Sequence, residues 1–283
     1  MIDAHHHLWK LSRADYGWIG GGRNPAVAPI ERDFLVEDYR AVAAANGIAG
    51  SIVVQAAQSV AETSWLLQQA RDSAGLIKGV VGWIDMEAAD APEVLHGLAQ
   101  DPLLRGIRPM LQEIANVEWV LQPRIVPALR AVMQLDLSFD LLVRPAYLKA
   151  ALGLLTRYPA LRAIVDHGGK PEISQRAWQP WADDIRRIAS ETSAYCKISG
   201  LVTEARTGWT AAELQPYVEH LIECFGSERL VWGSDWPVML LNGDYHGWLV
   251  AAKQCIASQT AAAQSAILND NAIRFYRLPA MTP

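Results

Sequence analysis

The sequence predicts an α/β protein of the (β/α)₈ barrel class, formed as one domain over residues 1–283. Short apolar, β-branched runs alternate with longer amphipathic stretches from one end of the chain to the other. Eight such pairs can be traced, and the chain length is close to the roughly 250 residues of a typical barrel of this class. No linker of biased composition divides the chain.

The expected strands are short, apolar and rich in β-branched residues. In chain order they cover residues 2–7, 50–56, 79–84, 104–108, 137–143, 163–167, 195–199 and 230–235. Between them, apolar residues recur every three to four positions, which is typical of helices that pack one face on a sheet. These expected helices cover residues 37–46, 61–74, 92–100, 123–134, 146–158, 178–191, 211–225, 248–258 and 261–276. Pro92, with Asp90 before it, and Pro145 indicate helix starts.

A doubly wound open sheet shows the same alternation and is the alternative architecture. Its usual phosphate-binding fingerprint, Gly-x-Gly-x-x-Gly after the first strand, does not occur in the sequence. The cluster Gly20-Gly21-Gly22 follows no expected strand and opens no helix. It lies in a long connection, residues 11–33, that is rich in Gly, Pro and aromatic residues. Such a loop over a barrel mouth is more often functional than idle.

The amino-acid composition excludes several classes of protein. With 51% apolar and 19% charged residues, the chain is typical of a packed globular body rather than a disordered one. The formal net charge is −5 without a Lys/Arg run, so we expect neither nucleic acid nor an anionic membrane as partner. Three cysteines are too few for a disulfide framework or a Cys-rich zinc site.

The chain begins without a basic segment followed by an apolar one, so no secretory signal is expected. Its apolar stretches are interrupted before the ~18–20 residues that cross a bilayer. We therefore expect a soluble, cytoplasmic protein. The sequence leaves the oligomeric state open.

Ionisable residues gather where the expected strands end, which is where barrel enzymes place their reacting groups. Strand side chains alternate, so Asp3, His5 and His7 are expected on one face of the first strand, with Ala4 and His6 on the other. His5 and His7 would then point at a common atom. His6 is expected to face the helices as a structural residue, and packing is expected for Asp3.

Two more strand ends supply matching chemistry. The sixth strand ends in His167 and the eighth in Asp235. Because parallel barrel strands end at one mouth, we expect four side chains to converge as the catalytic group. They are His5, His7, His167 and Asp235. By contrast, His96 and His220 lie in expected helices and are predicted to face solvent.

Other residues near strand ends are candidates for substrate binding. Three cations could meet negative charge on the substrate or in the transition state: Arg108, Lys170 and Lys197. Gln55 could hydrogen-bond the substrate. Trp83 and Trp236 could be core residues or a platform for a sugar face, and for Trp236, beside Asp235, we favour the platform.

Four segments resemble the amidohydrolase superfamily: Ile-Asp-Ala-His-His-His-Leu-Trp, Val-Asp-His-Gly-Gly-Lys-Pro, Lys-Ile-Ser-Gly-Leu and Gly-Ser-Asp-Trp-Pro. More closely, they resemble its lactonase-like branch, which holds sugar-acid lactonases of the L-fuconolactonase and L-rhamnonolactonase kind. The similarity runs in order from residue 2 to about residue 276. It implies a (β/α)₈ barrel that opens a lactone ring with water.

The resemblance also bears on metal binding. The wider superfamily often takes a lysine or glutamate from the fourth strand and a histidine from the fifth to hold two metals. Here the fourth strand ends in Arg108 and the fifth in Leu141-Leu142-Val143-Arg144. We therefore expect no metal or one divalent ion, with zinc preferred. The ligands of that ion would be His5, His7, His167 and Asp235.

Lactone hydrolysis requires an activated water and stabilisation of an oxyanion. Asp235 is the expected base, because an unshifted carboxylate is ionised at neutral pH. The histidines would polarise the carbonyl directly or through one metal. Two alternatives stay open: a metal-dependent decarboxylase or amidase on the same barrel, and a non-catalytic sugar-binding barrel. The identity of the lactone stays open too, because Pro109 follows Arg108 where many sugar-lactonase relatives place histidine.

Overall fold

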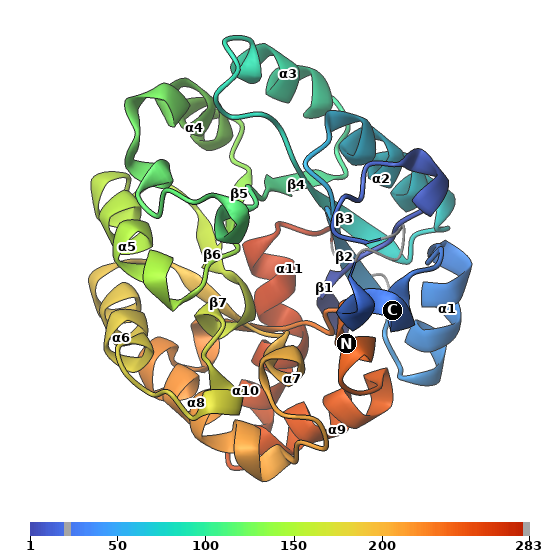
Figure 1. Cartoon of the computed structure of the whole chain (residues 1–283), viewed down its shortest axis with the longest axis vertical. Coiled ribbons are helices and arrows are strands. Elements are labelled where there is room, and N and C mark those ends of the chain that lie inside the picture. The colour runs from blue at the N-terminus through green and yellow to red at the C-terminus, as the bar shows by residue number, and fades with distance from the viewer. Residues whose placement is uncertain (20–23, 280–283) are drawn as a thin grey trace.

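The computed structural model describes residues 1–19 and 24–279, so the Gly20-Gly21-Gly22 cluster lies outside the described residues. Eight parallel strands form one sheet in the order β1 to β8 (Figure 1). The sheet closes because the segment after β8 returns to β1, where His7 N donates to Trp236 O at 2.6 Å and Asp235 N donates to His5 O at 2.7 Å. The strands are β1 (Ile2–His6), β2 (Gly50–Val54), β3 (Ile77–Gly82), β4 (Leu104–Ile107), β5 (Ser138–Leu141), β6 (Ala163–Val165), β7 (Tyr195–Ile198) and β8 (Leu230–Trp232). The predicted (β/α)₈ barrel is confirmed.

Helices surround the strands as an outer ring, and α11 lies near the middle of the view down the barrel (Figure 1). The helices are α1 (Val36–Ala45), α2 (Val60–Asp72), α3 (Ala91–Leu98), α4 (Val126–Gln134), α5 (Leu148–Arg157), α6 (Trp181–Glu191), α7 (Leu201–Glu204), α8 (Ala211–Phe225), α9 (Tyr245–Cys255), α10 (Ala261–Ser265) and α11 (Asn271–Phe275). A π-helical turn, Ala266–Asp270, joins α10 to α11. None of the helices in the described residues combines the length and apolar character that a membrane crossing needs.

The apolar core has two parts. The larger part lies between the sheet and the helices. The smaller part fills the barrel, where Ile2 and Ala4 of β1 pack with residues from other strands. Phe275 and Tyr276, at the end of the chain, belong to this inner part. The C-terminal segment therefore closes the inside of the barrel, opposite to the strand ends that carry the ionisable residues.

A β-bulge in β1 changes the face on which Asp3 lies. The pairing with β2 shifts by one residue between Asp3 and His6. The Asp3 carboxylate points to the helices, where it accepts hydrogen bonds from Tyr39 of α1 at 3.0 Å and Tyr245 of α9 at 2.9 Å. The prediction that Asp3 shares a face with His5 and His7 is therefore wrong, because strict alternation fails at a bulge. His6 faces the helices as predicted and stacks on Tyr39.

Two smaller differences concern strand ends and one histidine. Strands β6 and β8 end two and three residues before the predicted ends, because the chain there enters tight turns. His220 is buried, and its Nε2 donates to the Ala182 carbonyl of α6 at 2.9 Å. The prediction of a solvent-facing His220 is wrong, since α8 turns that position toward α6. His96 is exposed, as predicted.

Candidate active site

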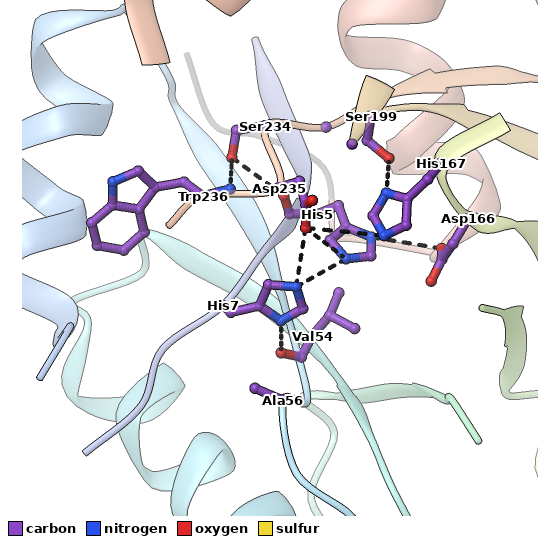
Figure 2. A network of polar contacts seen from close by, with 12 residues as sticks. His5, His7, Val54, Ala56, Asp166, His167, Ser199, Ser234, Asp235 and Trp236 are labelled. Carbon is purple, nitrogen blue, oxygen red and sulfur yellow. Dashed lines mark hydrogen bonds and ion pairs between the residues drawn. The ribbon is translucent and has the colours of Figure 1, made fainter. Parts of the chain in front are cut away.

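Four side chains converge at the mouth of the barrel (Figure 2). The Nε2 atoms of His5 and His7 are 3.3 Å apart. Asp235 Oδ1 lies 3.2 Å from His7 Nε2, 3.8 Å from His5 Nε2 and 4.0 Å from His167 Nε2. Each of the four residues is at most 4% exposed. The structure thus brings together, around one carboxylate oxygen, the residues that the strand-end pattern singles out.

Unusual backbone conformations bring two of these side chains to the mouth. His167 and Asp235 have φ values of 55° and 59°, in the left-handed region, and Lys170 has φ 51°. Non-glycine residues pay of order 1–3 kcal/mol for such conformations, which gather at functional sites. Gly200, with φ 61°, leaves room for the imidazole of His167: a Cβ atom at position 200 would lie 2.5 Å from its Nδ1 atom. The turn after β7 therefore depends on glycine to seat His167.

Hydrogen bonds on the far side of the rings orient two of the imidazoles. His7 Nδ1 donates to the carbonyl of Val54 at 2.8 Å. His167 Nδ1 lies 2.9 Å from Ser199 Oγ. In neutral His7 the proton is therefore on Nδ1, and Nε2 turns a lone pair toward Asp235. Contacts of this kind fix which nitrogen is available for chemistry or for a metal.

A buried ion network lies beneath the histidines. Lys197 Nζ is 2.7 Å from Asp140 Oδ2 and 2.8 Å from Asp166 Oδ1, and it also lies 3.1 Å from His5 Nδ1. Arg108 reaches Asp166 Oδ2 at 3.3 Å. Two cations thus face two carboxylates inside the barrel. The network balances its own charge and gives His5 a rigid support.

A cavity of about 290 Å³ opens above this group. Its wall combines apolar side chains with charged and amide groups, and it includes three of the four converging residues. The lining residues are His7, Trp18, Ala56, Arg108, Met110, Gln112, Glu113, Leu142, Arg144, His167, Lys170, Asp235 and Val238. A small organic molecule placed here would contact the Asp235 carboxylate directly.

The three predicted substrate-binding cations lie at different depths. Arg108 and Lys170 line the cavity. Lys170 Nζ is 3.4 Å from the Glu204 carboxylate, at the mouth. Lys197 is fully buried in the ion network and does not line the cavity. Its position inside β7, below the strand end, explains the difference.

Gln55 and Trp83 lie outside the cavity wall. Gln55 is fully buried, and its Nε2 donates to the Arg108 carbonyl at 2.9 Å, which ties the ends of β2 and β4 together. Trp83 lines a neighbouring cavity. Met110 lines both cavities and lies between the two.

The tryptophan in the cavity wall is Trp18, from the long loop after β1. Its Nε1 donates to the Ala56 carbonyl at 2.7 Å, which holds the loop over the mouth. Trp236 points away from the histidines (Figure 2) and is buried against Phe34 and Tyr39. The turn at Asp235 directs the carboxylate and the next side chain to opposite sides. In the structure Trp236 is therefore a core residue and does not line the cavity, in contrast to the interpretation as a platform that the sequence favours.

Sequence reasoning missed Trp18, Gln112 and Arg144, all of which line the cavity. Gln112 and Arg144 follow β4 and β5 by a few residues. Their positions shortly after strands could have identified Gln112 and Arg144 in the sequence, because the βα loops of a barrel form the site. Trp18 lies in the one long loop over the mouth, where its aromatic character could have marked it.

Burial and neighbouring charges shift the titration of the site. Burial lowers the pKa of His167 to about 4. Burial and the Lys197 ammonium hold the pKa of His5 well below its usual value. Burial alone would raise the pKa of Asp235, but the positive charge that His167 carries at acidic pH, where the carboxylate titrates, and the hydrogen bond with His7 hold it below the ordinary range. At pH 7 the site therefore holds an ionised Asp235 beside an uncharged His167.

The converging atoms fit one divalent ion. Ligand atoms ~2.0–2.2 Å from a tetrahedral zinc lie about 3.3–3.6 Å apart, close to the 3.2–3.8 Å separations among His5, His7 and Asp235. These three form a possible ligand group. His7 Nε2 and Asp235 Oδ1 face each other at 3.2 Å, so an ion between them would take one ligand atom from each. Asp166 could join His5 and His167 in a second group, but Lys197 and Arg108 already neutralise it.

Comparison with known proteins agrees with this geometry. The amidohydrolase family model matches residues 2–278. An L-fucono-1,5-lactonase from Burkholderia ambifaria is 38% identical over 98% of this chain and 95% of its own length, and one from Burkholderia multivorans is 34% identical over 98% and 96%. A crystal structure of a Burkholderia multivorans amidohydrolase with bound zinc has a TM-score of 0.91 at 33% identity, covering 98% of this chain and 99% of that one. The chain belongs to the amidohydrolase family.

Proposed function

We propose that this protein hydrolyses a sugar-acid lactone, with Asp235 as the base. The observation that carries the proposal is the position of the Asp235 carboxylate, which lies among three imidazoles and lines the cavity. The two relatives named L-fucono-1,5-lactonase, at 38% and 34% identity, make L-fucono-1,5-lactone the first substrate to assay.

In the proposed reaction, Asp235 takes a proton from a water molecule as the water oxygen attacks the lactone carbonyl carbon. Its lowered pKa keeps the carboxylate available at pH 7, although it also weakens the base. The carbonyl oxygen becomes an oxyanion. Arg108 and His167, which both line the cavity, would donate to it, His167 from Nε2 while its Nδ1 accepts from Ser199 Oγ. Breaking the ring carbon–oxygen bond returns the proton from Asp235 to the ring oxygen and leaves an aldonic acid, which ionises to the aldonate and releases one proton to solvent.

If a metal is bound, we propose that His5, His7, His167 and Asp235 hold one divalent ion, with zinc preferred. Such an ion would supply Lewis acidity at the carbonyl or lower the pKa of water. In this arrangement His5 Nε2 and His7 Nε2 face each other at 3.3 Å, and Lys197 Nζ supports the His5 ring from the other side, 3.1 Å from its Nδ1 atom.

The test is acid release from a panel of pentono-, hexono- and 6-deoxyhexonolactones, followed with a pH indicator against the spontaneous rate. Parallel samples contain a chelator. We expect at least one lactone to be opened far above the spontaneous rate. Absence of turnover with the whole panel would contradict the proposal. Release of CO₂ or an amine from another substrate, abolished by the chelator, would favour the decarboxylase or amidase alternative. Binding of a sugar lactone without turnover would favour a binding protein.

A further inference from the structure

Two polar residues of the cavity wall have hydrogen-bonding capacity that the described part of the chain does not use. Gln112 Oε1 is buried without a hydrogen-bond partner. Within residues 1–19 and 24–279, the Arg144 guanidinium makes neither a hydrogen bond nor an ion pair, and Arg144 is exposed at the mouth. Two other charged residues of the cavity wall already have partners. Glu113 accepts from Gln58 at 2.9 Å, and Lys170 pairs with Glu204.

The two residues lie side by side in the fold and across the barrel from the catalytic aspartate. Gln112 follows β4 and Arg144 follows β5, and the backbone N–H of Gln112 donates to the Leu142 carbonyl at 3.2 Å. His7 and Asp235 follow β1 and β8, which are three or four strands away from β4 and β5 in the closed order. All four side chains line the same cavity. A lactone with its carbonyl at Asp235 would therefore extend its remaining atoms toward Gln112 and Arg144.

The chemistry of the pair selects the kind of group that would bind. Gln112 presents an acceptor that lacks a donor, whereas Arg144 presents donors that lack an acceptor. A hydroxyl group can satisfy both, because it donates one hydrogen bond and accepts others. A carboxylate could accept from Arg144 and from the Gln112 amide Nε2, but it has no proton to donate to Gln112 Oε1. The pair thus matches a neutral polyol better than an anion.

We propose that Gln112 and Arg144 form a subsite that binds the ring hydroxyl groups of the substrate and so distinguishes sugar lactones from unsubstituted lactones. This inference rests on the proposed lactonase function. A site that has a buried polar group unpaired rejects a ligand lacking the complementary group, since that group then stays unpaired in the complex.

The test compares L-fucono-1,5-lactone with δ-valerolactone, which has the same ring size and no hydroxyl groups. The variants are Gln112→Met and Arg144→Met. Arg130→Met is the matched control, because Arg130 is exposed on α4 and does not line the cavity. We expect each subsite variant to lose about tenfold in kcat/KM for the sugar lactone, mainly through KM. The rate with δ-valerolactone should change less than about twofold. Equal losses with both lactones, or no loss, would overturn the inference.

A binding measurement keeps the subsite testable without turnover. Calorimetry with 1,5-anhydrogalactitol, which has ring hydroxyls and no carbonyl, reads the subsite directly. We expect the unmodified protein and Arg130→Met to bind it with the same affinity, and both subsite variants to bind about tenfold more weakly. Equal affinity in all four proteins, or no binding to any, would overturn the subsite. Failure of the lactonase proposal would instead appear as no hydrolysis of either lactone while this binding pattern persists.

Discussion

The two sides of the cavity are built in contrasting ways. On the β1, β6 and β8 side, the converging side chains are buried, and their rings are fixed by contacts to Val54, Ser199 and Lys197. On the β4 and β5 side, Gln112 and Arg144 leave hydrogen-bonding groups unused within the described residues. The side chains of the first side are held by contacts within the protein, whereas those of the second side keep hydrogen-bonding groups that a ligand could use. This difference fits the two proposed roles, since a catalytic group needs fixed geometry and a binding subsite needs hydrogen-bonding groups that are free to meet the substrate.

We call the β1, β6 and β8 side of the cavity the fixed side. The largest effect is expected at its centre, from a substitution of Asp235. Asp235→Asn keeps the size of the side chain but cannot accept a proton at neutral pH. We predict a fall in kcat of roughly 10²–10⁴-fold with the lactone that the unmodified protein turns over best. Asp183→Asn, exposed on α6, is the matched control. Thermal midpoint and kcat are measured on the same preparation. A well-folded Asp235→Asn protein with full activity would remove this aspartate from the mechanism.

The second largest effect is expected from the buried ion network beneath the histidines, and it concerns the stability of the fold. Lys197→Met leaves Asp140 and Asp166 buried without their shared cation. Breaking a buried ion network in this way typically costs about 3–5 kcal/mol in the free energy of unfolding. Urea denaturation measures the loss, with Lys149→Met, exposed on α5, as control. A stability loss no larger than that of the control would show that the network does not support the fixed side.

Two tryptophans offer a matched comparison between core and cavity. Trp236 is packed against Phe34 and Tyr39, so Trp236→Leu should lower the free energy of unfolding by about 2 kcal/mol. Trp18 lines the cavity, so Trp18→Leu should raise KM severalfold with a smaller loss of stability. Denaturation and steady-state kinetics on both variants check this. The reverse pattern would mean that Trp236 is the residue that contacts the substrate.

The number of metal ions bound per chain tests the description of the fixed side. The ligand group of His5, His7 and Asp235 has room for one ion, and Asp166 is held by Lys197 and Arg108. Elemental analysis of the purified protein should therefore find at most one divalent ion per chain. Asp235→Asn should weaken retention of that ion during dialysis, whereas Asp183→Asn should not. Two ions per chain in the active protein would contradict this description of the site.

The sequence was sufficient to predict the barrel and the convergence of the four residues, because parallel strands end at one mouth. It was insufficient where the direction of a side chain depends on the backbone conformation of a turn or a bulge. A left-handed conformation at Asp235 separates the carboxylate from Trp236, and a bulge turns Asp3 outward. The burial of Lys197 depends on Asp140 and Asp166, which lie 57 and 31 residues away in the sequence. Pairings at that range have no local signal.

The central claim is that water opens a lactone ring in this cavity. Its most direct measurement is the hydrolysis of L-fucono-1,5-lactone, or of the best lactone in the panel, in ¹⁸O-labelled water, followed by mass spectrometry. Attack at the carbonyl carbon predicts one ¹⁸O atom in the carboxylate of the acid, formed faster than in protein-free solution and at a much lower rate with Asp235→Asn. Product formation no faster than in the protein-free sample, or label in the hydroxyl group released from the ring, would contradict the account.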